Sequence, residues 1–120
     1  MTVLIVDDHE NMCWILSKIL AEAGFEVETA NCATEAMIRL GNREICAAII
    51  DYRLPDRDGL ALFEAMRKQV PELPGILVTS YGSSSLRQTA LNRGFYAYLD
   101  KPFSNSILVT HLKEMIGCKS

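Results

Sequence analysis

The stretch VLIVDDHE, residues Val3 to Glu10, joins four consecutive apolar residues to two adjacent aspartates. Such an unbroken apolar run is typical of a strand that is buried on both faces of a sheet. Asp7 and Asp8 follow where this strand ends, although like charges a few ångströms apart repel each other. The stretch therefore predicts a buried strand, and its two carboxylates need a physical reason.

Short runs rich in Val, Ile and Leu alternate along the chain with longer segments that have apolar residues at helical spacing. We expect strands at residues 2–6 (TVLIV), 25–30 (FEVETA), 46–50 (CAAII), 75–79 (GILVT) and 95–99 (FYAYL). Five strands alternating with five helices require right-handed crossovers and a parallel sheet that is covered on both faces. The predicted fold is α/β, a flavodoxin-like (βα)5 three-layer sandwich.

Cap residues predict where the helices begin and end. The first helix has an apolar face from Met12 to Ala23 and ends at Gly24; the second has its face at 33–40, capped by Asn31 and ended by Gly41. The third, at 59–68, is capped by Asp58, and the fourth, at 85–92, is capped by the preceding serines and ended by Gly94. Ser104 is expected to cap the last helix, whose apolar face is formed by Leu108, Leu112, Met115 and Ile116.

Length and composition favour one domain over residues 1–120, standing alone or belonging to a longer regulator. No apolar run is long enough to span a bilayer, and no signal-peptide pattern is seen, so we expect a cytoplasmic protein without membrane contact. The formal charge is −3 and no Lys/Arg cluster occurs, which argues against nucleic-acid contact by this domain alone. The cysteines lack metal-site spacing, so we expect reduced thiols at Cys13, Cys32, Cys46 and Cys118.

Polar residues stand at the carboxyl ends of the predicted strands, where ligands bind in doubly wound sheets. They are Asp7 and Asp8, Asp51, Thr79 with Ser80, and Asp100 with Lys101. Carboxylates crowded together favour a bound cation, and hard oxygen ligands suit Mg²⁺ or Mn²⁺. Asp51 could then act as a nucleophile, with Lys101 and Thr79 holding the oxygens of a phosphoryl group.

The acidic pair DD, the segment DYRLPDRDG around Asp51, VTS and LDKPF together resemble the receiver domain of two-component response regulators, with a chemotaxis-regulator-like fold. The resemblance covers nearly the whole chain and implies strand order 2-1-3-4-5. It implies that Asp51 accepts a phosphoryl group from the phosphohistidine of a sensor histidine kinase or phosphotransfer protein. It also implies direct Mg²⁺ ligation by Asp8, Asp51 and the backbone carbonyl of Arg53, with Asp7 acting through water.

The resemblance further implies a switch. Thr79 moves toward the new phosphate, the aromatic side chain of Tyr98 rotates inward, and the surface formed by the fourth helix, fifth strand and fifth helix changes. A homodimer could form through that surface, and transcription would be regulated where an output domain exists. Such a domain catalyses only its own phosphorylation and dephosphorylation, so it is a signalling domain more than an enzyme. The Lys101–Pro102 bond corresponds to one that is often cis in the family.

Several positions depart from the family's common residues or leave alternatives open. Arg53 and Tyr81 are bulky and together could shield the phosphoryl group from water, or both could point into solvent. Ser80 and Asp56 replace the commoner alanine and glycine, and neither removes a group that the chemistry needs. His9 is interpreted as a solvated loop residue in preference to a metal ligand. Trp14 is interpreted as a packing residue or as surface that a kinase could contact.

Two other functions are alternatives for this sequence. A degenerate receiver would act by protein contact without phosphorylation, which the intact set of acidic residues, Thr79 and Lys101 argues against. A small flavodoxin-like or phosphatase-like enzyme could share the fold. A flavin site would need a phosphate cradle after the first strand, where this chain has carboxylates that would repel phosphate.

Overall fold

The computed structural model describes residues 1–42 and 44–117, which fold as five strands and five helices in strict alternation. The strands are β1 (Thr2–Val6), β2 (Glu26–Ala30), β3 (Ile45–Asp51), β4 (Gly75–Thr79) and β5 (Ala97–Asp100). The helices are α1 (Glu10–Glu22), α2 (Ala33–Asn42), α3 (Gly59–Gln69), α4 (Ser84–Asn92) and α5 (Asn105–Gly117). Among the described residues, no helix is both long and apolar enough to cross a membrane.

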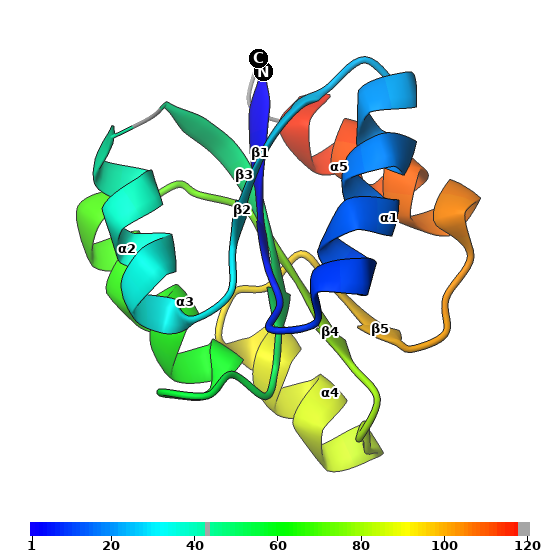
Figure 1. The fold of residues 1–120 in the computed structure, drawn as a ribbon. Coiled ribbons are helices and arrows are strands. Elements are labelled where there is room, and N and C mark those ends of the chain that lie inside the picture. Colours follow the sequence, from blue (N-terminus) through cyan, green and yellow to red (C-terminus); the bar gives the residue numbers. More distant parts are fainter. Residues whose placement is uncertain (43, 118–120) are drawn as a thin grey trace.

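All strand pairs are parallel and the sheet order is β2-β1-β3-β4-β5, which confirms the predicted topology. Alternate side chains of β1 point to opposite faces because the strand repeats every two residues. Val3 and Ile5 pack in the core beneath α1 and α5, whereas Leu4 and Val6 pack in the core beneath α2, α3 and α4. Figure 1 shows α1 and α5 on one side of the sheet and α2 and α3 on the other.

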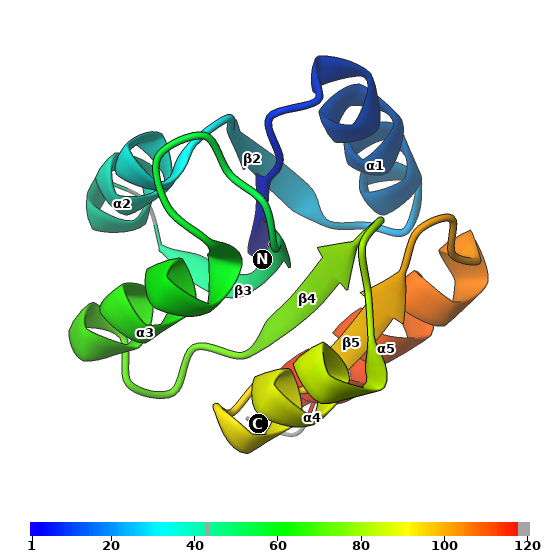
Figure 2. The ribbon, with the colours of Figure 1, turned by 90° about the horizontal axis from the view of Figure 1, so that it is seen from below.

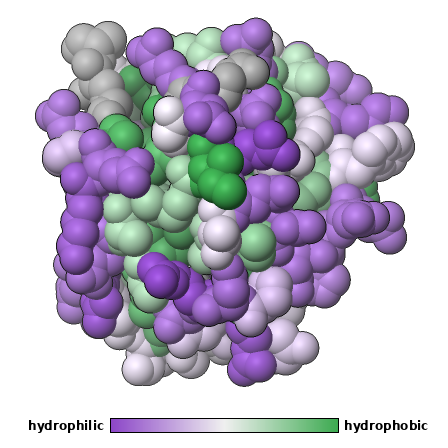
Figure 3. All heavy atoms as spheres, turned by 60° about the vertical axis from the view of Figure 1, so that its left-hand side comes forward, coloured by the Kyte–Doolittle hydropathy of each residue, from purple (hydrophilic) through white to green (hydrophobic). Residues whose placement is uncertain are grey.

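Polar residues collect at the edge of the sheet where the strands have their carboxyl ends. Because the strands are parallel, their carboxyl ends lie at the same edge, and the loops that follow them gather there (Figure 2). The face that carries α2 and α3 is mainly hydrophilic, with a small group of hydrophobic side chains near its centre (Figure 3). The structure therefore presents the loops after the strands as the place where polar side chains from distant segments meet.

Several predicted helix boundaries are confirmed. Gly24 and Gly94 follow α1 and α4 with φ angles of 98° and 101°, a conformation that glycine adopts without strain. Asp58 caps α3 by accepting a hydrogen bond from the Ala61 N–H at 2.8 Å. Ser83 caps α4 through its hydroxyl, which accepts from the Leu86 N–H at 3.0 Å. The apolar face predicted for α5 is buried.

Other boundary predictions were wrong or only partly right. Gly41 does not end α2, which continues to Asn42, and Asn31 does not cap it, because the first N–H groups of the helix bond to a distant carboxylate. Ser104 precedes α5 and its carbonyl accepts from the Leu108 N–H, but its hydroxyl contacts that of Ser106.

The predicted fifth strand was too long at its start. Strand β5 begins at Ala97, because Phe95 is held in the core by stacking on Phe63, with ring centroids 4.0 Å apart. Tertiary packing thus decided the start of this strand, which apolar composition alone placed two residues earlier.

Cys13, Cys32 and Cys46 form no disulfide within the described residues, and Cys118 lies outside them.

Two glycines give opposite predictions for stability. A Cβ on Gly75 would lie 2.6 Å from a ring atom of Phe63, which is fully buried and cannot easily move. Gly75→Ala should therefore lower the free energy of unfolding by about 1–3 kcal/mol. Gly41→Ala, in helical backbone with no atom within 4 Å of the new Cβ, should raise it by about 0.5 kcal/mol. Urea unfolding of both variants tests this, and a shift in the same direction for both would contradict the packing argument.

Candidate functional site

Polar side chains from four strand ends meet at one edge of the sheet. Asp7 follows β1, Asp51 ends β3, Thr79 ends β4 and Lys101 follows β5. Parallel pairing places Asp51 beside Val78 on β4, and Thr79 beside Asp100 on β5. Asp7, Asp51 and Thr79 are all buried. Burial is uncommon for the two carboxylates unless they are paired. The structure thus brings together residues that follow or end four different strands, as the sequence predicted.

The Lys101 ammonium pairs with both buried carboxylates. Its Nζ lies 2.7 Å from Asp7 Oδ2 and 3.4 Å from Asp51 Oδ2, so Asp7 is the closer partner. Burial by itself would lower the pKa of Lys101, but the hydrogen bond to Asp7 and the two negative charges raise the pKa overall. The Lys101–Pro102 peptide bond is cis, as the family resemblance implies.

The surroundings of Asp51 disfavour the ionised form of its carboxyl group. Burial raises the pKa of Asp51 above its usual value, and the negative charge of Asp7 raises it further, against the lowering influence of Lys101. The Arg53 N–H donates a long hydrogen bond of 3.3 Å to Asp51 Oδ1. Gly59 lies so close that a Cβ there would be 2.6 Å from the Asp51 backbone oxygen, so this position requires glycine.

Four side chains could supply ligands to one metal ion. Ligand atoms of Asp7, Asp8, His9 and Asp51 lie within 4.8 Å of one another, with Asp7 and Asp51 buried and the other two exposed. His9 Nδ1 lies 3.1 Å from Asp7 Oδ1 and 3.2 Å from Asp8 Oδ1. The His9 side chain is 72% exposed, as expected for a loop residue, but its contact with both carboxylates was not predicted. Oxygen-rich donors of this kind suit a hard divalent cation.

Thr79 and Tyr98 occupy separate hydrogen-bond networks. Thr79 Oγ1 accepts from the Tyr81 N–H at 3.0 Å. The Tyr98 ring is buried, and its hydroxyl donates to Asp100 Oδ1 at 3.0 Å and accepts from the Ser83 N–H at 3.1 Å. Burial and then the bond to Asp100 raise the pKa of Tyr98. Nothing in the sequence indicates this link from β5 to the cap residue of α4.

Arg53 and Tyr81 contact each other, although each comes from a different loop. The Arg53 guanidinium lies 4.3 Å from the centroid of the Tyr81 ring, within the range of a cation–π interaction. Tyr81 remains 66% exposed. The two bulky residues that the sequence singled out form one pair, and both are exposed to solvent.

Cys13 and Trp14 are neighbours on α1 with different surroundings. Cys13 Sγ donates to the Asp7 carbonyl at 3.2 Å, and burial together with the Asp7 charge raises the pKa of this thiol to about 11. Trp14 is 63% exposed with the Lys18 ammonium 4.5 Å from its ring, which favours the surface interpretation over core packing. Ser80 is exposed. Asp56, where the family more often has glycine, makes hydrogen bonds to the start of α2.

Comparison with known proteins identifies the family. Residues 3–113 match the response regulator receiver domain family. The chain is 36% identical over 108 residues to the C4-dicarboxylate transport transcriptional regulatory protein DctD of Rhizobium meliloti (strain 1021), covering 90% of this chain and 24% of the relative. It therefore spans about a quarter of the length of the curated relatives it matches.

Two solved structures have the same fold. The receiver domain protein (CheY-like) of Methanospirillum hungatei JF-1 gives a TM-score of 0.92 at 34% identity, covering 98% of this chain and 94% of the other. The beryllofluoride-activated NtrC4 receiver domain dimer gives a TM-score of 0.94 at 30% identity, covering 99% and 98%. A family match over nearly the whole chain, together with the acidic cluster at the strand ends, shows that this chain belongs to the response regulator receiver domain family of two-component signalling.

Proposed function

We propose that Asp51 is the phosphoacceptor of this receiver domain. The observation that carries the proposal is the buried Asp51 carboxylate, held at a strand end beside Asp7 and within reach of the Lys101 ammonium. A carboxylate oxygen of Asp51 bonds to phosphorus as the phosphorus–nitrogen bond of a phosphohistidine breaks. The donor imidazole leaves with the bonding electron pair and takes a proton from solvent.

A divalent cation, Mg²⁺ or Mn²⁺, fits the donor set of this site. Asp8, Asp51 and the Arg53 carbonyl would hold it directly, and Asp7 would act through water. The fit rests on the charge of the site, because one ammonium faces two buried carboxylates and an exposed third lies nearby. When bound, the ion supplies positive charge to the transferring phosphoryl group. The protein contributes the fixed positions of the oxygen ligands.

Lys101 and Thr79 would contact the oxygens of the phosphorylated site. Lys101 already reaches Asp51, and Thr79 is fully buried at the end of the neighbouring strand. The Thr79 hydroxyl accepts from the Tyr81 N–H and keeps its own hydrogen to donate, and it would move toward the new phosphate. The loop after β4 would follow, and Tyr98 would change its bonds to Asp100 and Ser83, which changes the surface of α4, β5 and α5.

The proposed partner for phosphorylation is a sensor histidine kinase or a phosphotransfer protein. A homodimer through α4, β5 and α5 is proposed as well, and its support is the similarity to a receiver domain whose title names an activated dimer. The relative DctD is named a transcriptional regulatory protein, so regulation of transcription is proposed where an output domain accompanies the receiver. Phosphorylation would then control how that partner or domain is bound.

Asp51→Asn tests the phosphoacceptor. With Mg²⁺ and acetyl phosphate, the unmodified chain should gain the mass of one phosphoryl group, whereas Asp51→Asn should gain none, because an amide is a poor nucleophile. Intact-protein mass spectrometry measures the gain. Asp58→Asn, which changes a carboxylate seven residues away in the same loop region, is the control and should be phosphorylated normally. Equal phosphorylation of Asp51→Asn and the unmodified chain would place the acceptor elsewhere.

Arg53 and Tyr81 would set the lifetime of the phosphorylated form. Hydrolysis requires water to attack phosphorus while the bond to the Asp51 oxygen breaks, releasing inorganic phosphate. The stacked pair of Arg53 and Tyr81 supports the proposal that these side chains restrict that approach. Their placement in two different loops means that both must be truncated to open the path fully.

The double variant Arg53→Asn with Tyr81→Ala should shorten the phosphorylated half-life several-fold, because the pair no longer excludes water. Loss of radioactive phosphate or of the phosphorylated mass over time measures the half-life. Each single variant should have an intermediate effect, since the remaining partner loses its stacking contact. An unchanged half-life in the double variant would show that the pair does not shield the phosphoryl group.

A further inference from the structure

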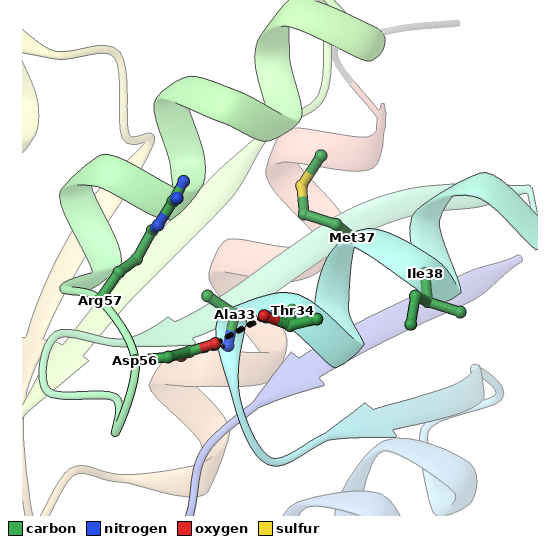
Figure 4. Close-up of a pocket in the computed structure, with 6 residues that line it drawn as sticks. All are labelled: Ala33, Thr34, Met37, Ile38, Asp56 and Arg57. Carbon is green, nitrogen blue, oxygen red and sulfur yellow. Dashed lines mark hydrogen bonds between the residues drawn. The ribbon is translucent and has the colours of Figure 1, made fainter.

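The N-terminus of α2 is capped by a carboxylate from another part of the chain. Asp56 Oδ1 accepts from the Ala33 N–H at 2.8 Å, and Oδ2 accepts from the Thr34 N–H at 3.0 Å and the Thr34 hydroxyl at 2.9 Å. Figure 4 shows Asp56 pointing at Ala33 and Thr34. These three residues line a surface hollow of about 420 Å³. A helix cap normally comes from the residue just before the helix, so this arrangement is unusual.

The Asp56 cap uses both oxygens of an ionised carboxylate. Hydrogen bonds from the Ala33 N–H and then the Thr34 N–H lower the pKa of Asp56 to about 2. Because this pKa lies below the ordinary aspartate value, the stabilisation is complete above that ordinary value and is lost as the pH falls toward 2. The contact between Asp56 and α2 is therefore fully formed at neutral pH.

Asp56 lies in the loop that begins directly after the phosphoacceptor. The Tyr52 N–H donates to the Val78 carbonyl at 2.9 Å, and the Gly59 N–H donates to the Tyr52 carbonyl at 2.7 Å, so the base of this loop is fixed to the sheet. Arg53 and Asp58 form an antiparallel bridge that closes it. Beyond that bridge the loop extends toward α2, and Asp56 attaches its tip there.

The segment that receives Asp56 is itself attached to the acidic pair. Helix α2 follows β2, and the carbonyl of Ala30 at the end of β2 accepts from the Asp7 N–H at 3.0 Å. A continuous path of contacts therefore runs from the Asp51 loop through Asp56 and the start of α2 to Asp7.

We propose that Asp56 is a positioning residue of the phosphoacceptor site: by fixing the tip of loop 52–58 to α2, it holds Arg53 in place beside Asp51. The inference rests on the proposed function, because it assigns the Arg53 carbonyl to the cation. Glycine at this position would leave the tip attached only through the base of the loop. Asp56 acts through the loop and does not touch the phosphoryl group.

Asp56→Ala, in the intact chain, tests the inference by Mg²⁺ titration calorimetry. Removing the cap should raise the dissociation constant for Mg²⁺ about tenfold, the lower end of the effect of outer residues on metal sites. The matched control is Glu35→Ala, which removes a different bond at the start of the same helix and leaves the loop untouched. It should bind Mg²⁺ as the unmodified chain does. Asp56→Asn, which keeps one acceptor oxygen, should be intermediate.

A second measurement separates positioning from general loss of stability. At saturating Mg²⁺, the rate of phosphorylation of Asp56→Ala by acetyl phosphate should stay several-fold below that of Glu35→Ala, with circular dichroism showing both folded. Equal Mg²⁺ affinity and equal rates in Asp56→Ala and Glu35→Ala would overturn the inference. If the unmodified chain bound Mg²⁺ but was never phosphorylated, the proposed function would fail, while the Mg²⁺ comparison would still decide the role of Asp56.

Discussion

The buried ammonium of Lys101, between the carboxylates of Asp7 and Asp51, is the interaction on which the rest of the site depends. Each carboxylate would be costly to bury alone, and one ammonium neutralises only one of them. Burial, the larger cause, and the negative charge of Asp7 together raise the pKa of Asp51. A site with this imbalance attracts a cation, and it disfavours a phosphoryl group until a cation is present. The proposed cation would give the adjacent aspartates after β1 a physical reason, because it would relieve their repulsion.

Two sets of contacts lead from the neighbouring strand ends to the surface. The Thr79 hydroxyl accepts a hydrogen bond from the Tyr81 N–H, and the Tyr81 ring contacts the Arg53 guanidinium. Tyr98 joins Asp100 to the backbone N–H of Ser83, the cap residue of α4. Gly82 packs so closely against Tyr98 and Asp100 that no side chain could be added there without moving them. Small changes at the centre can therefore alter the start of α4, because tightly packed groups move together.

The fold and the centre of the site could be predicted from sequence because their signals are local or periodic. Apolar runs located the strands, and the carboxyl ends of parallel strands must share an edge, so Asp51 and Lys101 had to approach each other. Contacts between loops have no such signal. The cap of α2 by Asp56 joins residues 22 and 23 positions apart, and nothing in the spacing of Asn31 or Gly41 indicates it. The bonds of Tyr98 similarly depend on how two loops pack, which only the structure determines.

Thermal unfolding of the unmodified chain and of Asp51→Asn, each with and without Mg²⁺, tests the charge-imbalance account most directly. Without Mg²⁺, Asp51→Asn should unfold a few degrees above the unmodified chain, because an amide of the same shape removes a buried charge whose pKa is raised in the folded state. Mg²⁺ should raise the unfolding temperature of the unmodified chain strongly and that of Asp51→Asn much less. A lower unfolding temperature for Asp51→Asn without Mg²⁺, or equal Mg²⁺ shifts in both proteins, would contradict the account.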